Sequence, residues 1–326
     1  MTGSEVFGPE DFEAVVAAAA RAPSILNCQP WRFHVHDDLV DLYVDPDQAP
    51  TVLDPTGREV FISLGAALLN LRLAVAARGR AAAVQLLPSI SEPTFVARLR
   101  VGGPAPYLQS ERLLHDAIPV RQCSRVPFTA EQVQYEDFMH LQEAASVEGG
   151  RLDSATGAHR FELVGLLHDA DATQRDDPAL VESMSRWVGD ERQPGAGIPA
   201  QSLGPVSRHP SSVVRDLALG RPVAGRGSAE FESSGLLATL LTTGDHPIDW
   251  VRAGLALERV LLTATVRGLS AGILSQATEV PALRSLVRDP SSRWSYPQVV
   301  LRFGYGPPMP PTHRRPMQDI LRIEPA

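Results

Sequence analysis

A polar loop near the start of the chain holds residue types suited to recognising a flat polar ring. Residues 22–31 read APSILNCQPW and follow an alanine-rich stretch typical of a helix. Pro23 does not allow that helix to continue. Ser24, Asn27 and Gln29 offer hydroxyl and amide groups, which donate and accept hydrogen bonds at the edge of a heterocycle. The alternative is a proline-pinned turn in which these side chains cap the backbone.

Two arginines further along the chain have a spacing suited to a phosphate group. Residues 121–125 read RQCSR. Two guanidinium groups a few residues apart can hold a phosphate through charge-assisted, forked hydrogen bonds. The alternative for Arg121 and Arg125 is that both are exposed residues ahead of a helix that Thr129 caps.

The basic residues narrow the classes of chemistry open to the chain. All 30 of them are arginine, since the sequence contains no lysine. This excludes a Walker-type phosphate lysine, a Schiff-base lysine and a kinase lysine. A net charge of −8 without a basic stripe argues against nucleic acid as a partner. Any phosphate is therefore bound by arginine or by backbone amides.

Length, composition and cysteine content indicate a globular protein without a disulfide framework. The chain has 326 residues, of which 44% are hydrophobic and 21% charged, enough for a substantial core. Cys28 and Cys123 lack zinc-ligand spacing, and no histidine motif supplies a metal site. The first residues lack a signal-peptide pattern, and no apolar run approaches the length of a membrane span. We therefore expect a cytoplasmic protein with no membrane partner and no bound metal.

Two apolar segments share a pattern that indicates an internal repeat. Residues 65–79 and 254–268 each begin and end on glycine, and they match at four further positions in register. Each is apolar on more than one face, as a buried helix is, and each closes on a glycine suited to a left-handed cap. We interpret the pair as a duplicated unit. Two unrelated core helices with the same kind of cap are the alternative.

The remaining patterns indicate an α+β chain. Apolar and alternating stretches predict strands at residues 33–35, 41–44, 83–87, 95–101, 161–163 and 298–303. Periodicity predicts helices at residues 136–145, 168–175 and 178–188, in addition to the two segments of the repeat. Residues 193–228 are rich in glycine, proline and serine. We expect a lid or a flexible loop there.

Taken in order along the chain, these motifs resemble the nitroreductase family of flavoproteins. The loop at residues 22–31 is similar to the family loop that touches FMN, and residues 121–128 are similar to its Arg-Arg-Ser-x-Arg-x-Phe element. Residues 297–306 resemble its last core strand, and residues 314–316 its Arg-x-Pro segment. Residues 268–276 resemble the loop whose backbone N–H faces the flavin N5. The resemblance covers most of the chain, in fragments.

The resemblance implies a set of FMN-binding residues. They are Pro23, Ser24, Asn27, Gln29, Arg121, Gln122, Cys123, Arg125, Ser275, Gln276, Arg314 and Arg315. In this set Ser275 would donate its backbone N–H at flavin N5, where a donor tunes the flavin potential. Arg314 falls on a family arginine that helps to bind phosphate, with Arg315 adjacent as a substitute. Gln122 and Cys123 depart from the pattern, because the family has an arginine and a serine there.

Family members are usually homodimers with FMN in the interface, and a chain with two central helices resembles such a dimer fused into one polypeptide. The resemblance implies a nitroreductase-like α+β fold of two tandem half-repeats, an intrachain pseudo-dimer with mixed or antiparallel sheets. Residues 1–105 would form the first repeat, with a buried central helix at 63–79. Residues 106–326 would form the second, with its helix at 250–268. One complete flavin site is expected, in a monomer or a homodimer of pseudo-dimers.

Two functions are compatible with this resemblance. The first is an FMN oxidoreductase in which NAD(P)H reduces the flavin and a nitroaromatic or quinone reoxidises it, with no obligatory catalytic side chain. The second is a non-enzymatic protein that sequesters or stores FMN under a lid, as the resemblance to the actinobacterial Acg-type branch suggests. A third reading, a binding or scaffold module that has lost flavin, follows from the departures at Gln122 and Cys123.

Overall fold

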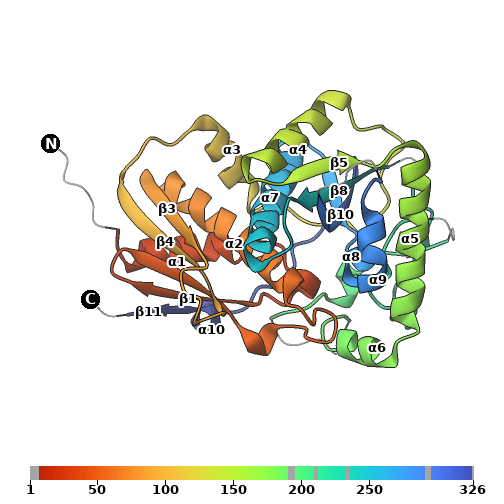
Figure 1. Ribbon diagram of the computed structural model, residues 1–326, viewed down its shortest axis with the longest axis horizontal. Coiled ribbons are helices and arrows are strands. Elements are labelled where there is room, and N and C mark those ends of the chain that lie inside the picture. The colour runs from red at the N-terminus through yellow and green to blue at the C-terminus, as the bar shows by residue number, and fades with distance from the viewer. Residues whose placement is uncertain (1–6, 190–194, 209–211, 233–234, 291–294, 325–326) are drawn as a thin grey trace.

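Two β-sheets lie on either side of a central pair of helices, α2 and α7 (Figure 1). The computed structural model describes residues 7–189, 195–208, 212–232, 235–290 and 295–324. The first sheet has the order β11-β1-β2-β4-β3 and the second the order β5-β8-β10-β9. Only the β1–β11 pair is parallel within these two sheets. The mixture of helices and mainly antiparallel sheets confirms the predicted α+β class.

The elements have the following bounds. The strands are β1 (Trp31–His36), β2 (Leu39–Val44), β3 (Arg80–Leu86), β4 (Phe95–Pro104), β5 (Arg151–Ser154), β6 (Val206–Ser207), β7 (Ser228–Ala229), β8 (Leu236–Thr242), β9 (Ser270–Ile273), β10 (Tyr296–Gly304) and β11 (Leu321–Ile323). The α-helices are α1 (Pro9–Ala19), α2 (Arg58–Ala77), α3 (Gln109–Ala117), α4 (Tyr135–Val147), α5 (Gly157–Arg175), α6 (Pro178–Ser185), α7 (Pro247–Val266), α8 (Gln276–Glu279), α9 (Pro281–Arg284) and α10 (Met317–Ile320). Short 3-10 turns cover Ile25–Asn27, Pro46–Gln48, Ala200–Ser202 and Ser285–Val287.

The two segments of the predicted repeat form α2 and α7, which cross at a reciprocal pair of glycines. A Cβ on Gly65 would lie 2.1 Å from the carbonyl oxygen of Val251, and a Cβ on Gly254 would lie 2.0 Å from that of Ile62. Each glycine therefore lets the other helix approach backbone to backbone. Such a self-complementary contact is what a two-fold axis between equivalent units produces. It supports the interpretation of a duplicated unit.

Each helix of the pair ends as its glycine pattern predicts. Gly79 and Gly268 follow the two helices with φ values of +68° and +74°, the left-handed conformation that glycine adopts without a steric penalty. The helices begin at Arg58 and Pro247, earlier than the predicted starts at residues 63 and 250. In the first helix the side chain of Asp54 accepts a hydrogen bond from the backbone N–H of Val60.

Among the differences between the fold and the sequence predictions, three concern a predicted strand, an unpredicted strand and the central helix α2. Residues 161–163, predicted as a strand, lie within α5, because a run this short fits a helical period as well as a strand. The strand β11 was not predicted, and it pairs with β1 at the edge of the first sheet (Figure 1). The third is α2, which is long and apolar enough to cross a membrane, although 78% of its most apolar 18-residue stretch is buried within the protein. This burial is typical of a core helix.

Candidate functional site

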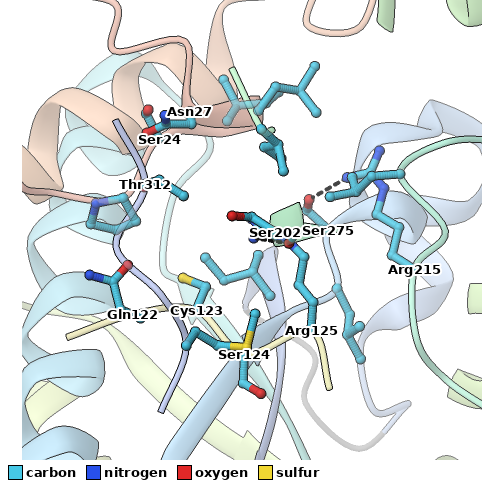
Figure 2. A pocket seen from close by; sticks show the side chains of 18 of the residues that line it. Ser24, Asn27, Gln122, Cys123, Ser124, Arg125, Ser202, Arg215, Ser275 and Thr312 are labelled. Carbon is cyan, nitrogen blue, oxygen red and sulfur yellow. Dashed lines mark hydrogen bonds between the residues drawn. The ribbon is translucent and has the colours of Figure 1, made fainter. Parts of the chain in front are cut away.

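A cavity of about 1170 Å³, its mouth included, is lined by residues from two stretches of the chain, 23–63 and 121–314. Its wall combines the loop after α1, the first turns of α2, the segment after α3, β9 and residues within 198–202 and 214–217 (Figure 2). Nine of the twelve predicted site residues line it: Pro23, Ser24, Asn27, Arg121, Gln122, Cys123, Arg125, Ser275 and Arg314. The structure thus brings together residues that lie up to 291 positions apart in the sequence, from Pro23 to Arg314.

The loop after α1 is held by its own polar side chains in an unusual conformation. Leu26, Asn27 and Gln29 have φ values of +48°, +53° and +54°, a region that non-glycine residues rarely adopt. The Ser24 hydroxyl accepts a hydrogen bond of 3.0 Å from the backbone N–H of Gln29. Asn27 donates through Nδ2 to the carbonyl oxygen of Gly197 at 2.9 Å. These bonds confirm the turn, and Ser24 and Asn27 also line the cavity. Their contact with a flat polar ring stays a prediction.

The segment at residues 121–125 is fixed along β9 rather than exposed. The backbone N–H of Ser124 donates to the carbonyl oxygen of Ala271 at 2.7 Å. Arg302, buried beneath, donates to the carbonyl oxygen of Val126 at 2.8 Å and pairs with Glu232. Thr129 does not cap a helix, because α4 begins only at Tyr135. The alternative of exposed arginines before a capped helix is therefore wrong.

Positive charge exceeds negative charge around this part of the cavity. In the part of the chain that the structure describes, Arg125 has no carboxylate partner and donates only to the carbonyl oxygen of Ser202, at 3.1 Å. Arg314 likewise bonds to carbonyl and side-chain oxygens, among them Asn27 Oδ1 at 3.2 Å, and pairs with no described carboxylate. Burial lowers the pKa of Arg125. Burial, with the charges of Arg121 and Arg21, lowers the pKa of Arg314 to about 10. An anionic ligand would relieve this excess of charge.

Ser275 lies across the cavity from the loop after α1 (Figure 2). Its hydroxyl donates to Glu279 Oε1 at 2.7 Å and accepts from Arg215 Nη1 at 3.1 Å. Within the described ranges, the backbone N–H of Ser275 meets no acceptor. A lining residue with a free backbone donor fits the predicted hydrogen bond to a ring nitrogen.

The glycine- and proline-rich covering segment (195–208 and 212–228) lines one side of the cavity. Of the predicted residues 193–228, positions 193–194 and 209–211 lie outside the described residues. Five of the others line the cavity: Ile198, Ser202, Val214, Arg215 and Leu217. Gly204 lies so close to the 121–125 segment that a Cβ there would be 2.0 Å from the carbonyl oxygen of Arg125. The segment is therefore packed onto the predicted phosphate-binding arginines.

Three predicted residues lie behind the cavity wall. Gln29 donates to the carbonyl oxygen of Gly195 at 3.0 Å and accepts from the backbone N–H of Arg315 at 2.8 Å. Arg315 pairs with Asp45 at 2.9 Å, so it is not a free substitute for Arg314. Gln276 is fully buried at the start of α8, and its amide has no described partner. Gln29 and Arg315 support the loop rather than face a ligand.

Sequence reasoning missed several polar residues of the wall. Glu59 and Ser63 come from α2, and Arg215 from the covering segment. Burial raises the pKa of Glu59 to about 7, against the charge of the adjacent Arg58. Arg215 is paired with Glu279, with Nη1 and Oε1 2.7 Å apart. For Glu59, the signal in the sequence that could have indicated a site residue is a charged side chain at the start of an otherwise apolar helix.

Sequence relatives decide the family. No family model matches the chain. The protein acg of Mycobacterium tuberculosis strain H37Rv, whose name ascribes to it an NAD(P)H nitroreductase activity, is 31% identical over 320 residues, 95% of each chain. A second protein of that strain, named for the same activity, is 30% identical over 96% of this chain and 91% of its own. The chain belongs to this nitroreductase family.

Solved nitroreductases resemble the chain more distantly. A nitroreductase from Desulfitobacterium hafniense with bound FMN is 15% identical, and the match covers 65% of this chain and 98% of the other with a TM-score of 0.40. The FMN-dependent nitroreductase NfnB from Mycobacterium smegmatis, solved with NADPH, is 15% identical over 66% of this chain and 99% of its own, with a TM-score of 0.39. Membership of the nitroreductase family therefore rests on the sequence relatives. This membership confirms both the resemblance inferred from the motifs and the prediction of a nitroreductase-like fold.

Proposed function

We propose that this nitroreductase-family chain binds one FMN and serves as an NAD(P)H-dependent oxidoreductase. The observation that carries the proposal is the pair of partly buried guanidinium groups, Arg125 and Arg314, which line the cavity without a described carboxylate partner. Arginines in this state favour a phosphate, which accepts forked, charge-assisted hydrogen bonds. The names of the relatives are consistent with it.

The residues of the wall fit the parts of FMN. Arg121, Arg125 and Arg314 would hold the phosphate, and the free backbone N–H of Ser275 would donate to the ring system. FMN supplies two-electron transfer from a nicotinamide to an electron-poor acceptor, such as a nitroaromatic or a quinone, when bound. The chain itself binds and orients the cofactor and limits the access of water. It needs no side chain as nucleophile.

A second function is favoured by the covering segment. Arg215 of that segment is anchored to the body by Glu279, Ser275 and Gln174, and Gly204 rests on the backbone of Arg125. A segment held this firmly would keep nicotinamide from the flavin. The protein would then sequester or store FMN without turnover.

An anaerobic visible spectrum of the FMN-loaded protein separates the two functions. An oxidoreductase is expected to lose the oxidised flavin bands on addition of NADPH or NADH and to regain them with a nitro compound or quinone. Bleaching by dithionite but not by either nicotinamide would contradict turnover and support sequestration. If no flavin binds, both functions are excluded.

A further inference from the structure

A buried carboxylate stands directly behind the cavity arginines, and no step of the proposed function uses it. Glu258 of α7 has 0% of its surface exposed. Its Oε1 lies 3.3 Å from Nε of Arg121. Among the described residues neither oxygen of Glu258 accepts a well-aligned hydrogen bond. A carboxylate buried in this way is costly to keep charged, because a single off-axis ion pair compensates it poorly.

Arg121 links this carboxylate to the cavity. Its Nη2 donates to the carbonyl oxygen of Arg21 at 3.1 Å, and its Nη1 lies 3.5 Å from Sγ of Cys123. Arg121 itself lines the cavity, whereas Glu258 does not. The guanidinium therefore stands between the carboxylate and the place of a bound anion.

The groups that act on Glu258 come from three elements besides its own. They are Arg121 in the segment after α3, Arg314 near the end of the chain and Asn70 of α2, all of which favour the charged carboxylate. Burial outweighs them and raises the pKa of Glu258 to about 7. The carboxyl thus gains or loses its proton close to neutral pH.

We infer that Glu258 is the proton-accepting counter-charge of Arg121, so that a phosphate bound at Arg121 is accompanied by protonation of Glu258. The inference rests on the proposed phosphate site. A phosphate carries close to two negative charges near neutral pH. The bound phosphate adds negative charge on the far side of Arg121 and partly neutralises the positive charge of its guanidinium. Both effects raise the pKa of Glu258 and favour its neutral form. Binding of the phosphorylated cofactor then takes up a proton.

The sign of the pH dependence follows from linkage. A proton taken up on binding makes affinity greatest at low pH, where Glu258 is already neutral, and weaker as pH rises above its pKa in the free protein. A ligand-induced rise of half to one pKa unit corresponds to a loss of about three- to tenfold in affinity. Riboflavin has the same ring without the phosphate, so its affinity should not follow this profile.

The test is titration of the full-length apoprotein with FMN and with riboflavin, followed by flavin fluorescence, between pH 6.5 and 9. In wild type, the dissociation constant of FMN is expected to rise about three- to tenfold across this range. The dissociation constant of riboflavin should change little, and by the same amount in wild type and in Glu258→Gln. In Glu258→Gln the rise should disappear, and FMN should bind at least as tightly as in wild type at pH 9. Calorimetry in buffers of different ionisation enthalpy should give uptake of a fraction of a proton near pH 7.5.

A flat FMN profile in the wild-type protein, or weaker binding by Glu258→Gln at every pH, would overturn the inference and leave Glu258 as a structural partner of Arg121. The wild-type profile and the proton count stand even if the variant fails to fold. If FMN binds at no pH, the proposed function fails instead, so the two failures are distinguishable.

Discussion

At the scale of single residues, Arg125 gives the most direct test of the phosphate site. Its guanidinium lines the cavity, and the one hydrogen bond that it donates to a described residue goes to a carbonyl oxygen. Because a hydrogen bond to a charged group contributes about 1.5–3 kcal/mol, Arg125→Ala should weaken FMN binding by about ten- to a hundredfold. Arg112→Ala is the matched control, since this side chain on α3 is 64% exposed and does not line the cavity. Equal affinities of the two variants, measured by flavin fluorescence, would remove Arg125 from the site.

Asp171 on α5 links pH to stability. Burial raises the pKa of Asp171 to about 6, although Arg215 and Arg175 oppose the shift. Its Oδ1 is buried without a described partner. Because the folded-state pKa lies above that of the unfolded chain, the favourable contribution is complete below about pH 4 and is lost as pH rises through about 6.

Asp171→Asn should therefore be more stable than wild type at pH 7, and the difference should shrink as pH falls to 4. Urea unfolding at a series of pH values measures it. If wild type is more stable than Asp171→Asn at pH 7, the charged form of Asp171 is not costly, and the prediction is contradicted.

The site residues were predictable where side-chain chemistry and sequence order were both informative. The arginine spacing at 121–125 and the loop at 22–31 led to residues that do line one cavity. Gln29 and Arg315 were misplaced, because the sequence cannot distinguish a side chain that faces a ligand from one that bonds to the neighbouring backbone. Arg215 was missed, because its loop carries no periodic signal that predicts contact with Glu279.

At the scale of secondary-structure elements, the α2–α7 crossing depends on Gly65 and Gly254. A Cβ on Gly65 would meet the carbonyl oxygen of Val251 at 2.1 Å, a backbone atom that cannot move without shifting α7. Gly65→Ala should therefore destabilise the protein by about 1–3 kcal/mol or more, despite the better helix propensity of alanine. Gly103→Ala in β4, where a Cβ would meet nothing within 4 Å, should stay within about 0.5 kcal/mol of wild type. Chemical denaturation compares the variants, and equal midpoints would contradict the close crossing.

The covering segment can be tested through a second pair of glycines. Gly204 and Gly225 both have positive φ, +72° and +73°, so alanine introduces similar backbone strain at each. Of the two, only Gly204 lies against another segment, because a Cβ at this position would be 2.0 Å from the carbonyl oxygen of Arg125. Gly204→Ala should lift the segment and speed FMN dissociation, whereas Gly225→Ala should resemble wild type. Stopped-flow release of FMN into excess apo-flavodoxin-type acceptor reports the rate, and identical rates would argue against a cover.

Elements with a strong apolar period were predicted, and those fixed by tertiary pairing were not. The central helices and most strands of the first sheet followed from periodicity and glycine caps. The strand β8 (Leu236–Thr242) is an uninterrupted apolar run that pairs on both sides, with β5 and β10, and a buried run of this kind does not distinguish strand from helix. The three residues of β11 form a strand only because β1 offers a free edge.

At the scale of the whole molecule, we propose that two duplicated halves enclose a single site. The reciprocal glycine contact supports an approximate two-fold axis between α2 and α7. The cavity is unsymmetrical, because the loop at 22–31 comes from the first half and the arginine segment at 121–125 from the second. The copies of these elements needed for a second, equivalent site are absent from the sequence. One chain should accordingly bind one flavin.

The central measurement is the stoichiometry of FMN binding to the purified full-length chain. Apoprotein at a concentration well above the dissociation constant is titrated with FMN, and the break point is read from flavin fluorescence and from the absorbance of the isolated complex. One FMN per chain is the predicted result. Two per chain would contradict the unsymmetrical cavity, and no binding would contradict the assignment of the arginine-lined cavity as a flavin site.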